Sequence, residues 1–218
     1  MVYLDCDIVV LGDISKLYNV KLGNNLLGAV NCNIISTHEV FGEYAERFVG
    51  VPRDKYLQSG VLVMNLKEFR KSDLENKFVY LINKYNFDVV DPDQAYLTAM
   101  CYGRVKYLPN GWNKEAIPTP LQGKLNIVHY ALYKKPWQYD DVIGSEYFWK
   151  YAKASPFYEI ILEIKDSFSD EQREKKEKAN IDIVEHARRL ITSEGSFVNQ
   201  VIKGDINWFD NLAIGDKG

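Results

Sequence analysis

Short apolar runs separated by polar turns recur along the first 140 residues of the chain. Residues 2–11 (VYLDCDIVVL), 26–35 and 56–66 are rich in Val, Ile and Leu. Strands that are covered on both faces have this composition, so each run predicts a buried strand. The segments VKYLPNGWN (105–113) and KLNIVHYALYKKPW (124–137) each predict a shorter strand that continues into a loop.

Segments with apolar residues at helical spacing lie between these strands. Asp13 can cap a short helix, and residues 37–50 carry an apolar stripe. The clearest helical pattern spans residues 73–86, where apolar positions recur every three or four residues. DPDQAYLTAM (91–100) predicts a further helix that ends before Gly103. This alternation of strands and helices predicts an α/β fold.

The character of the sequence changes in its last third. Residues 145–164 are aromatic and apolar and predict helix, whereas residues 167–180 (SFSDEQREKKEKAN) are mostly charged. A charge run of this kind forms an exposed helix or a linker, and its mixed signs favour solvent over a membrane surface or a partner. Residues 181–191 predict an amphipathic helix. We therefore expect an α/β domain over 1–140 and a helical C-terminal extension with a tail over 141–218.

Composition and charge narrow the function classes. The chain has 218 residues, 46% of them hydrophobic, with 27 Lys and Arg against 30 Asp and Glu. It can bury a core, but it has neither the basic patch of a nucleic-acid-binding protein nor a polybasic membrane stripe. No apolar run reaches the ~18 residues of a transmembrane helix. Three widely spaced cysteines indicate reduced thiols, so we expect a cytoplasmic protein.

Asp5 and Asp7 interrupt the first apolar run. Residues two apart in an extended strand face the same way, so both carboxylates should lie on one face. Two like charges buried there would need a cation between them. The alternative is that the strand ends near Asp5 and that the pair is solvated or caps a turn, and the pattern alone leaves both interpretations open.

His129 closes another apolar strand, LNIVH, at the strand end where open α/β sheets place their ligands. Two carboxylates and one imidazole suit Mn²⁺, which also accepts phosphate oxygens. An isolated strand-end histidine is more often an ordinary hydrogen-bonded residue, but the neighbouring Lys134 and Lys135 favour an anionic ligand. The sequence has neither GxxxxGK[ST] nor GxGxxG, so a metal and a lysine would have to hold any nucleotide phosphates.

Five blocks in this chain resemble glycosyltransferase family 8, the group that includes glycogenin and bacterial lipopolysaccharide galactosyltransferases. The blocks are YLDCDIVVLGDISKLY, YLQSGVLVMNLKEFRK, DPDQAYLTAM, VKYLPNGWN and HYALYKKPW, in the order of the family. Together they span roughly residues 2–137.

The resemblance implies a retaining, UDP-sugar-dependent hexosyltransferase with a Rossmann-like nucleotide-diphospho-sugar transferase fold. It implies that Mn²⁺, or Mg²⁺, binds to Asp5, Asp7 and His129. It also implies that Lys135 contacts the diphosphate and steadies the UDP leaving group. We expect the acceptor to be a glycan or glycolipid in cell-envelope or capsular polysaccharide synthesis, and peripheral attachment at the inner face of the membrane remains an open alternative.

On the sugar side, Asp93 and Gln94 match the family's Asp-Gln pair beside the donor sugar. Gln94 is a poor nucleophile, so we expect front-face attack by the acceptor hydroxyl rather than a long-lived glycosyl-enzyme. Asp93 could instead only cap the helix that follows it. The resemblance places Pro109, Asn110 and Tyr133 on the acceptor side.

Several positions depart from the family pattern. Leu132 stands where the family has glycine, so it puts a side chain where backbone approaches the phosphate or the acceptor. Gln58 replaces an asparagine, Cys32 lies about where many relatives have an aspartate near the sugar, and Thr98 replaces another asparagine. These changes spare the metal ligands but affect the residues expected to select the donor sugar.

The largest departure precedes the aspartate pair. In the family a nucleotide-binding portion comes before this motif, whereas four residues precede Asp5 here. We therefore expect an N-terminally truncated form of the fold, with reduced affinity for UDP. Loss of that portion would also leave an unpaired sheet edge that favours self-association.

Two other functions remain open at this point. The chain could be a catalytically inert fragment that acts as a subunit or binding module. It could also be a metal-dependent phosphohydrolase with Asp5 as nucleophile, because an Asp-x-Asp after an apolar strand occurs there as well.

Overall fold

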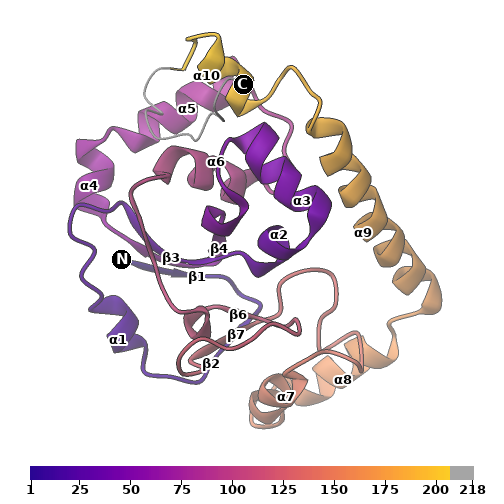
Figure 1. The fold of residues 1–218 in the computed structure, drawn as a ribbon. Coiled ribbons are helices and arrows are strands. Elements are labelled where there is room, and N and C mark those ends of the chain that lie inside the picture. The colour runs from indigo at the N-terminus through magenta and orange to yellow at the C-terminus, as the bar shows by residue number, and fades with distance from the viewer. Residues whose placement is uncertain (207–218) are drawn as a thin grey trace.

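The computed structural model describes residues 1–206, and their strands form two small mixed sheets (Figure 1). The first has the strand order β1 (Val2–Leu4), β4 (Leu57–Met64), β3 (Leu27–Asn31), β5 (Val105–Tyr107). The second has the order β2 (Ile8–Val10), β7 (Ile127–His129), β6 (Lys114–Glu115). In the first sheet β4 pairs antiparallel with β1 and β3, and β5 runs parallel to β3. In the second, β7 pairs antiparallel with β2 and parallel with β6.

Helices connect and cover these strands. They are α1 (Ile14–Tyr18), α2 (Asn33–Thr37), α3 (Glu39–Tyr44), α4 (Leu66–Lys71), α5 (Leu74–Lys84), α6 (Pro92–Cys101), α7 (Ser145–Lys153), α8 (Tyr158–Asp166), α9 (Asp170–Leu190) and α10 (Phe197–Ile202). A π-helical turn (Ala45–Val49) extends α3, and short 3₁₀ turns lie at Arg53–Lys55 and Asn110–Trp112. The mixture of sheets and helices confirms the predicted α/β class. Within residues 1–206, no helix combines the length and the hydropathy needed to cross a bilayer.

Strand β4 shows why its sequence is apolar at successive positions. Val61 and Val63 belong to a buried cluster with Ile127 of β7. Leu62 points the other way, into a cluster with Leu27 and Cys101. Because adjacent side chains on a strand face opposite sides, burial on both faces requires an uninterrupted apolar run. Strand β4 therefore contributes to a separate buried cluster on each of its faces.

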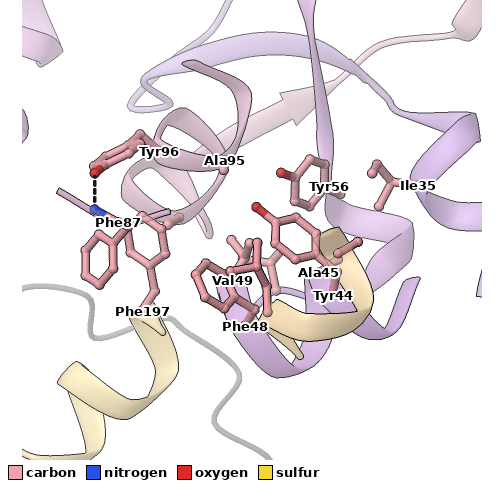
Figure 2. Close-up of a cluster of buried hydrophobic side chains, with 14 of the residues drawn as sticks. Ile35, Tyr44, Ala45, Phe48, Val49, Tyr56, Phe87, Ala95, Tyr96 and Phe197 are labelled. Atoms are coloured by element: carbon pink, nitrogen blue, oxygen red, sulfur yellow. Dashed lines mark hydrogen bonds between the residues drawn. The ribbon is translucent and has the colours of Figure 1, made fainter. Parts of the chain in front are cut away.

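The largest core cluster is aromatic and lies between α3, α6 and the C-terminal helices (Figure 2). The rings of Phe87 and Phe197 stack with their centroids 4.0 Å apart, and the Phe87 backbone N–H donates to the Tyr96 hydroxyl over 3.0 Å. From α9, Ala187 and Leu190 are buried in the same cluster. Helices α9 and α10 therefore share a core with the α/β part. The end of the predicted extension, 207–218, lies outside the described residues.

The prediction of one strand over residues 2–11 was wrong. That run forms β1 and β2, which belong to different sheets, and residues 5–7 cross between them. The crossing is fixed on both sides: the Asp5 N–H donates to the Gly60 carbonyl over 2.9 Å, and the Tyr130 N–H donates to the Asp7 carbonyl over 3.0 Å. The polar residues that interrupt the apolar run mark this change of sheet.

Other boundaries also differ from the predictions. The strand expected over 26–35 ends at Asn31, and helix α2 begins at Asn33. The helix expected over 145–164 is divided into α7 and α8 near Pro156, whose ring cannot continue a helix. The charge run and the amphipathic segment after it form a single helix, α9, which begins with a capping box at Ser169. The helices predicted over 73–86 and 91–100 are confirmed.

Candidate functional site

The two aspartates and His129 meet where the two sheets adjoin. Asp5 and Asp7 lie in the crossing between β1 and β2, and His129 is the last residue of β7. One ligand atom from each residue lies within 4.8 Å of the others. The His129 Nε2 atom is 3.2 Å from Asp7 Oδ1 and 3.7 Å from Asp5 Oδ2. The fold thus brings His129 beside two aspartates from the first seven residues of the chain.

The orientation of the His129 ring follows from a chain of amide contacts. Its Nδ1 atom lies 2.9 Å from Asn113 Oδ1, while Asn113 Nδ2 donates to Gln58 Oε1 over 3.1 Å. Because the amide of Asn113 offers its oxygen to the ring, Nδ1 donates its hydrogen to Asn113 and Nε2 is left facing the two carboxylates. His129 is 3% exposed and Asn113 is fully buried, so water does not replace these contacts.

This arrangement fits a divalent cation. A cation lying among these atoms would offset the like charges of the two aspartates and accept the Nε2 lone pair. Two carboxylate groups and one imidazole, with the other ring nitrogen held by a neighbouring amide, form a suitable donor set for Mn²⁺ or Mg²⁺.

Gly60 is required by the close approach of His129. A Cβ at this position would lie 2.2 Å from His129 Cε1 and 2.9 Å from Asp5 Oδ2. Both distances are far inside van der Waals contact, so only glycine lets β4 pass behind the site.

Lys135 adds a positive charge to the same cluster. Its Nζ atom donates to Asp7 Oδ2 over 2.6 Å and to the Tyr130 carbonyl. Burial alone would raise the pKa of Asp7, but hydrogen bonds and charges from His129 and Lys135 outweigh it and hold that pKa well below its usual range. Asp5 accepts a hydrogen bond from the Tyr3 hydroxyl over 2.8 Å, which raises the pKa of Tyr3 to about 12.

Asp93 and Gln94 lie on different sides of the first turn of α6. Gln94 is buried and its amide is held at both ends: Oε1 accepts from the Ser59 N–H over 2.9 Å, and Nε2 donates to Asp91 Oδ2 over 2.8 Å. Asp93 is exposed and lines a separate cavity of about 600 Å³ between α4, α5 and α6. Although Asp93 and Gln94 are adjacent in sequence, their side chains therefore face different cavities.

Asp91, a partly buried carboxyl group, lies behind Gln94. It accepts hydrogen bonds from the Tyr56 hydroxyl (2.8 Å) and from Gln94. Burial raises the pKa of Asp91 to about 7, although these hydrogen bonds oppose the shift. The carboxyl group thus positions Gln94 and holds its own proton up to near-neutral pH.

A second cavity, of about 390 Å³, opens beside Gln94. Its lining includes three of the residues that the resemblance placed near the substrates, Cys32, Gln58 and Tyr133, together with Leu132. The Cys32 thiol donates to Glu115 Oε1 over 3.4 Å, and burial raises the pKa of both groups. The structure thus gathers these predicted substrate residues around one cavity.

Leu132 retains the backbone conformation of a glycine. Its φ is +74°, in the left-handed region, and its side chain is 46% exposed at the cavity. The loop therefore keeps the path that glycine would give it, with an added side chain.

Pro109 and Asn110 lie at the start of the 3₁₀ turn that precedes β6. Asn110 is buried, and its amide bonds the loop that follows: Nδ2 donates to the Pro120 carbonyl and Oδ1 accepts from the Gln122 N–H. The structure gives Asn110 a role in holding this loop, and its predicted contact with the acceptor stays a prediction.

Sequence reasoning missed three groups of this site: Asn113, Glu115 and Asp91. Asn113 is the last residue of the VKYLPNGWN block and Glu115 follows it by two positions, and both are almost fully buried. Polar residues beside a short strand at a predicted ligand edge were the available signal for both. Asp91 had the weaker signal of an aspartate before a helix, which more often indicates a cap.

Comparisons with known proteins agree with the geometry. The sequence model of glycosyl transferase family 8 matches residues 1–141. A putative glycosyltransferase of Haemophilus influenzae is 26% identical over 148 residues, which cover 68% of this chain and 43% of that protein. Lipopolysaccharide 1,2-glucosyltransferase of Escherichia coli K12 is 24% identical over 221 residues, covering 94% of this chain and 60% of that protein.

A solved structure supports the same relationship. The galactosyltransferase LgtC, crystallised with donor and acceptor sugar analogs, superimposes with a TM-score of 0.61 at 25% identity. The superposition covers 71% of this chain and 61% of LgtC. The fold is therefore that of the GT-A nucleotide-sugar transferases, and the chain spans 43% to 61% of the length of these three proteins.

Proposed function

Because the chain belongs to glycosyl transferase family 8, we propose that it transfers a hexose from a UDP-sugar to a hydroxyl group of a glycan or glycolipid, with retention of the anomeric configuration. The observation that carries this proposal is the cluster of Asp5, Asp7 and His129 beside Lys135. Carboxylate oxygens, an imidazole and an ammonium group within one cluster suit a metal-bound diphosphate.

The three clustered side chains would hold Mn²⁺ or Mg²⁺. Bound there, a divalent cation supplies Lewis-acid stabilisation of the negative charge on a departing diphosphate. Asn113 keeps His129 in the tautomer that can ligate, and Gly60 allows the ring to reach the carboxylates. The crossing between β1 and β2 fixes both aspartates on the same side.

Lys135 would stabilise the leaving group directly. Its ammonium group is fixed between Asp7 and the Tyr130 carbonyl, so it is already oriented when charge develops on the diphosphate. A preorganised charge of this kind is usually the largest electrostatic contribution to catalysis.

The amide of Gln94 supports front-face attack by the acceptor hydroxyl. Its oxygen is engaged by the Ser59 N–H and its nitrogen by Asp91, so it acts as a fixed dipole near the sugar rather than as a nucleophile. The acceptor hydroxyl would then attack from the same face that the diphosphate leaves.

By analogy with the E. coli lipopolysaccharide glucosyltransferase, we propose that the glycan belongs to the cell envelope. The three cysteines are free thiols, which suits a reducing, cytoplasmic location. Self-association through β1, the outer strand of its sheet in residues 1–206, belongs to the same proposal.

Transfer is tested by incubating the chain with Mn²⁺ and a panel of UDP-hexoses and following UDP release and the anomeric signal of the product by NMR. We expect metal-dependent UDP release that is lost in the Asp5→Asn, Asp7→Asn double variant. An inverted product, or no UDP release from any UDP-hexose by folded protein, would contradict the proposal. The second result would favour an inert subunit, a function that the added side chain at Leu132 also suits.

A further inference from the structure

Helix α9 forms one wall of the 390 Å³ cavity that contains Gln94 and Gln58. Four of its residues line the cavity, Lys176, Ala179, Asn180 and Ile183. Ala179, Asn180 and Ile183 lie three, four and seven residues after Lys176, so all four share one face of the helix. This helix lies beyond the 141 residues that the family model matches.

The wall is held in place at both ends of the helix. At its C-terminal end Ala187 and Leu190 are buried in the aromatic core. At its N-terminal end the Arg173 guanidinium lies over the Tyr139 ring, 4.8 Å from its centroid, and over the Phe168 ring at 5.3 Å. Figure 1 shows α9 running along the side of the molecule from α8 to the neighbourhood of α3. The cavity therefore has a fixed wall.

The wall presents a cation without a counter-ion. The Lys176 Nζ atom donates to Gln138 Oε1 over 2.7 Å, and within residues 1–206 no carboxylate forms an ion pair with it. Burial lowers the pKa of Lys176, and the positive charge of Lys135 lowers it further. Among the described residues that line the cavity, the one carboxyl group is that of Asp91, which is already engaged by Tyr56 and Gln94.

The rest of the lining suits a sugar. Gln58, Gln94 and Asn180 offer amide groups for hydroxyls, whereas Tyr133 and Phe41 offer aromatic surface. The volume is in the range of small-ligand pockets, and it would hold one or two monosaccharide units.

We infer that the acceptor sugar occupies the α9 side of this cavity, beside the donor-sugar residue Gln94, and that α9 selects an acceptor with an acidic group, whose carboxylate or phosphate pairs with Lys176. The inference rests on the proposed function, because it assigns the hydroxyl donor of that reaction. The neutral amides bind the sugar ring, and the ammonium group supplies the preference for a negative charge.

The test is an NMR titration of the isotope-labelled chain with methyl β-D-glucuronide, with its phosphate counterpart methyl β-D-glucoside 6-phosphate, and with neutral methyl β-D-glucoside. Lys176→Gln removes the charge but keeps the length of the side chain. Lys178→Gln is the matched control, since Lys178 is exposed on the opposite face of the same helix. We expect both acidic sugars to shift the amide signals of Tyr133 and Asn180 and to bind about tenfold more tightly than the glucoside. Lys176→Gln should remove that preference, and Lys178→Gln should keep it.

Equal binding of the acidic and neutral sugars, no shift at these amides with any of the sugars, or equal effects of the two variants would overturn the inference. A preference for only one of the acidic sugars would support it and identify the group. Titration of UDP with Mn²⁺ into the Lys176→Gln variant separates the inference from the proposed function. Unchanged UDP binding supports the inference, whereas a loss of UDP binding would place Lys176 at the diphosphate and overturn it. Acidic-sugar binding without any UDP binding would instead contradict the proposed function alone.

Discussion

Replacement of Asn113 by alanine tests how His129 is prepared to ligate a metal. The variant removes the acceptor of the His129 Nδ1 hydrogen and a donor to Gln58 Oε1, both inside the protein. Gln58 Oε1 keeps its bond from the Gly60 N–H, so the main loss is one buried, unpaired imidazole N–H. A buried donor without a partner costs about 1–3 kcal/mol, so the free energy of unfolding should fall by about 2 kcal/mol.

The same change should weaken metal binding. Without Asn113 the ring can rotate or carry its hydrogen on Nε2, and loss of such an orienting partner typically costs about 10- to 100-fold in metal affinity. The affinity is measured from the EPR signal of free Mn²⁺, and the stability from urea unfolding of the metal-free chain. Asn76→Ala, which removes an exposed amide contact to Asp73 on α5, is the control and should change neither.

The two readouts separate positioning from general stability. If Asn113→Ala lowers the stability but leaves the Mn²⁺ affinity within twofold of the wild type, Asn113 is only structural and the argument about the tautomer of His129 is refuted.

Three further substitutions give distinct expectations. Gly60→Ala should abolish Mn²⁺ binding measured by EPR, because the added methyl group would lie 2.2 Å from His129 Cε1; retained affinity would contradict the packing argument. Leu132→Gly should unfold in urea with a higher midpoint than Leu132→Ala, since alanine keeps a left-handed strain of about 1–2 kcal/mol that glycine does not have, and the reverse order would be inconsistent with φ of +74°. Asp91 holds its proton up to about pH 7 when folded but loses it near pH 4 when unfolded, so its contribution to the free energy of unfolding declines as pH rises through that window, by up to about 4 kcal/mol. Unfolding of Asp91→Asn across pH 4–8 should therefore show the variant gaining stability relative to the wild type as pH rises, and a constant difference would rule out the raised pKa.

The sequence predicted the elements whose pattern is long and regular. The helix over 73–86 has apolar residues on one stripe through more than two turns, and α5 forms there. The run 56–66 predicted a strand buried on both faces, which is how β4 packs. Elements of this kind can be predicted from local composition, because the prediction does not require knowing which distant segment packs against them.

Pairing between distant segments could not be predicted in the same way. Residues 2–11 satisfy the pattern of one strand, and only the contacts of Asp5 with Gly60 and of Asp7 with Tyr130 divide them between two sheets. The strand expected through Ile34 and Ile35 became helix α2 because Cys32 and Asn33 bond to Glu115, 82 or more positions away. These boundaries depend on tertiary contacts that a local pattern does not contain.

For the site, the sequence identified the charged residues and missed the residues that orient them. Asp5, Asp7 and His129 stand out because charged or titratable groups interrupt apolar strands. Asn113 acts through its amide contact with the His129 ring, and Lys176 lies in a charge run that predicted only an exposed surface. A neutral amide or one lysine among many has no distinguishing sequence signal until the fold shows what it faces.

Calorimetric titration of UDP into the chain, with and without Mn²⁺, tests the central claim most directly, with the Asp5→Asn, Asp7→Asn double variant as comparison. The account predicts binding of UDP that requires Mn²⁺ and is lost in the double variant, because Asp5, Asp7 and His129 hold the cation that the diphosphate completes. UDP binding that is independent of Mn²⁺ or unaffected by the double substitution, or no binding by protein shown to be folded, would contradict it.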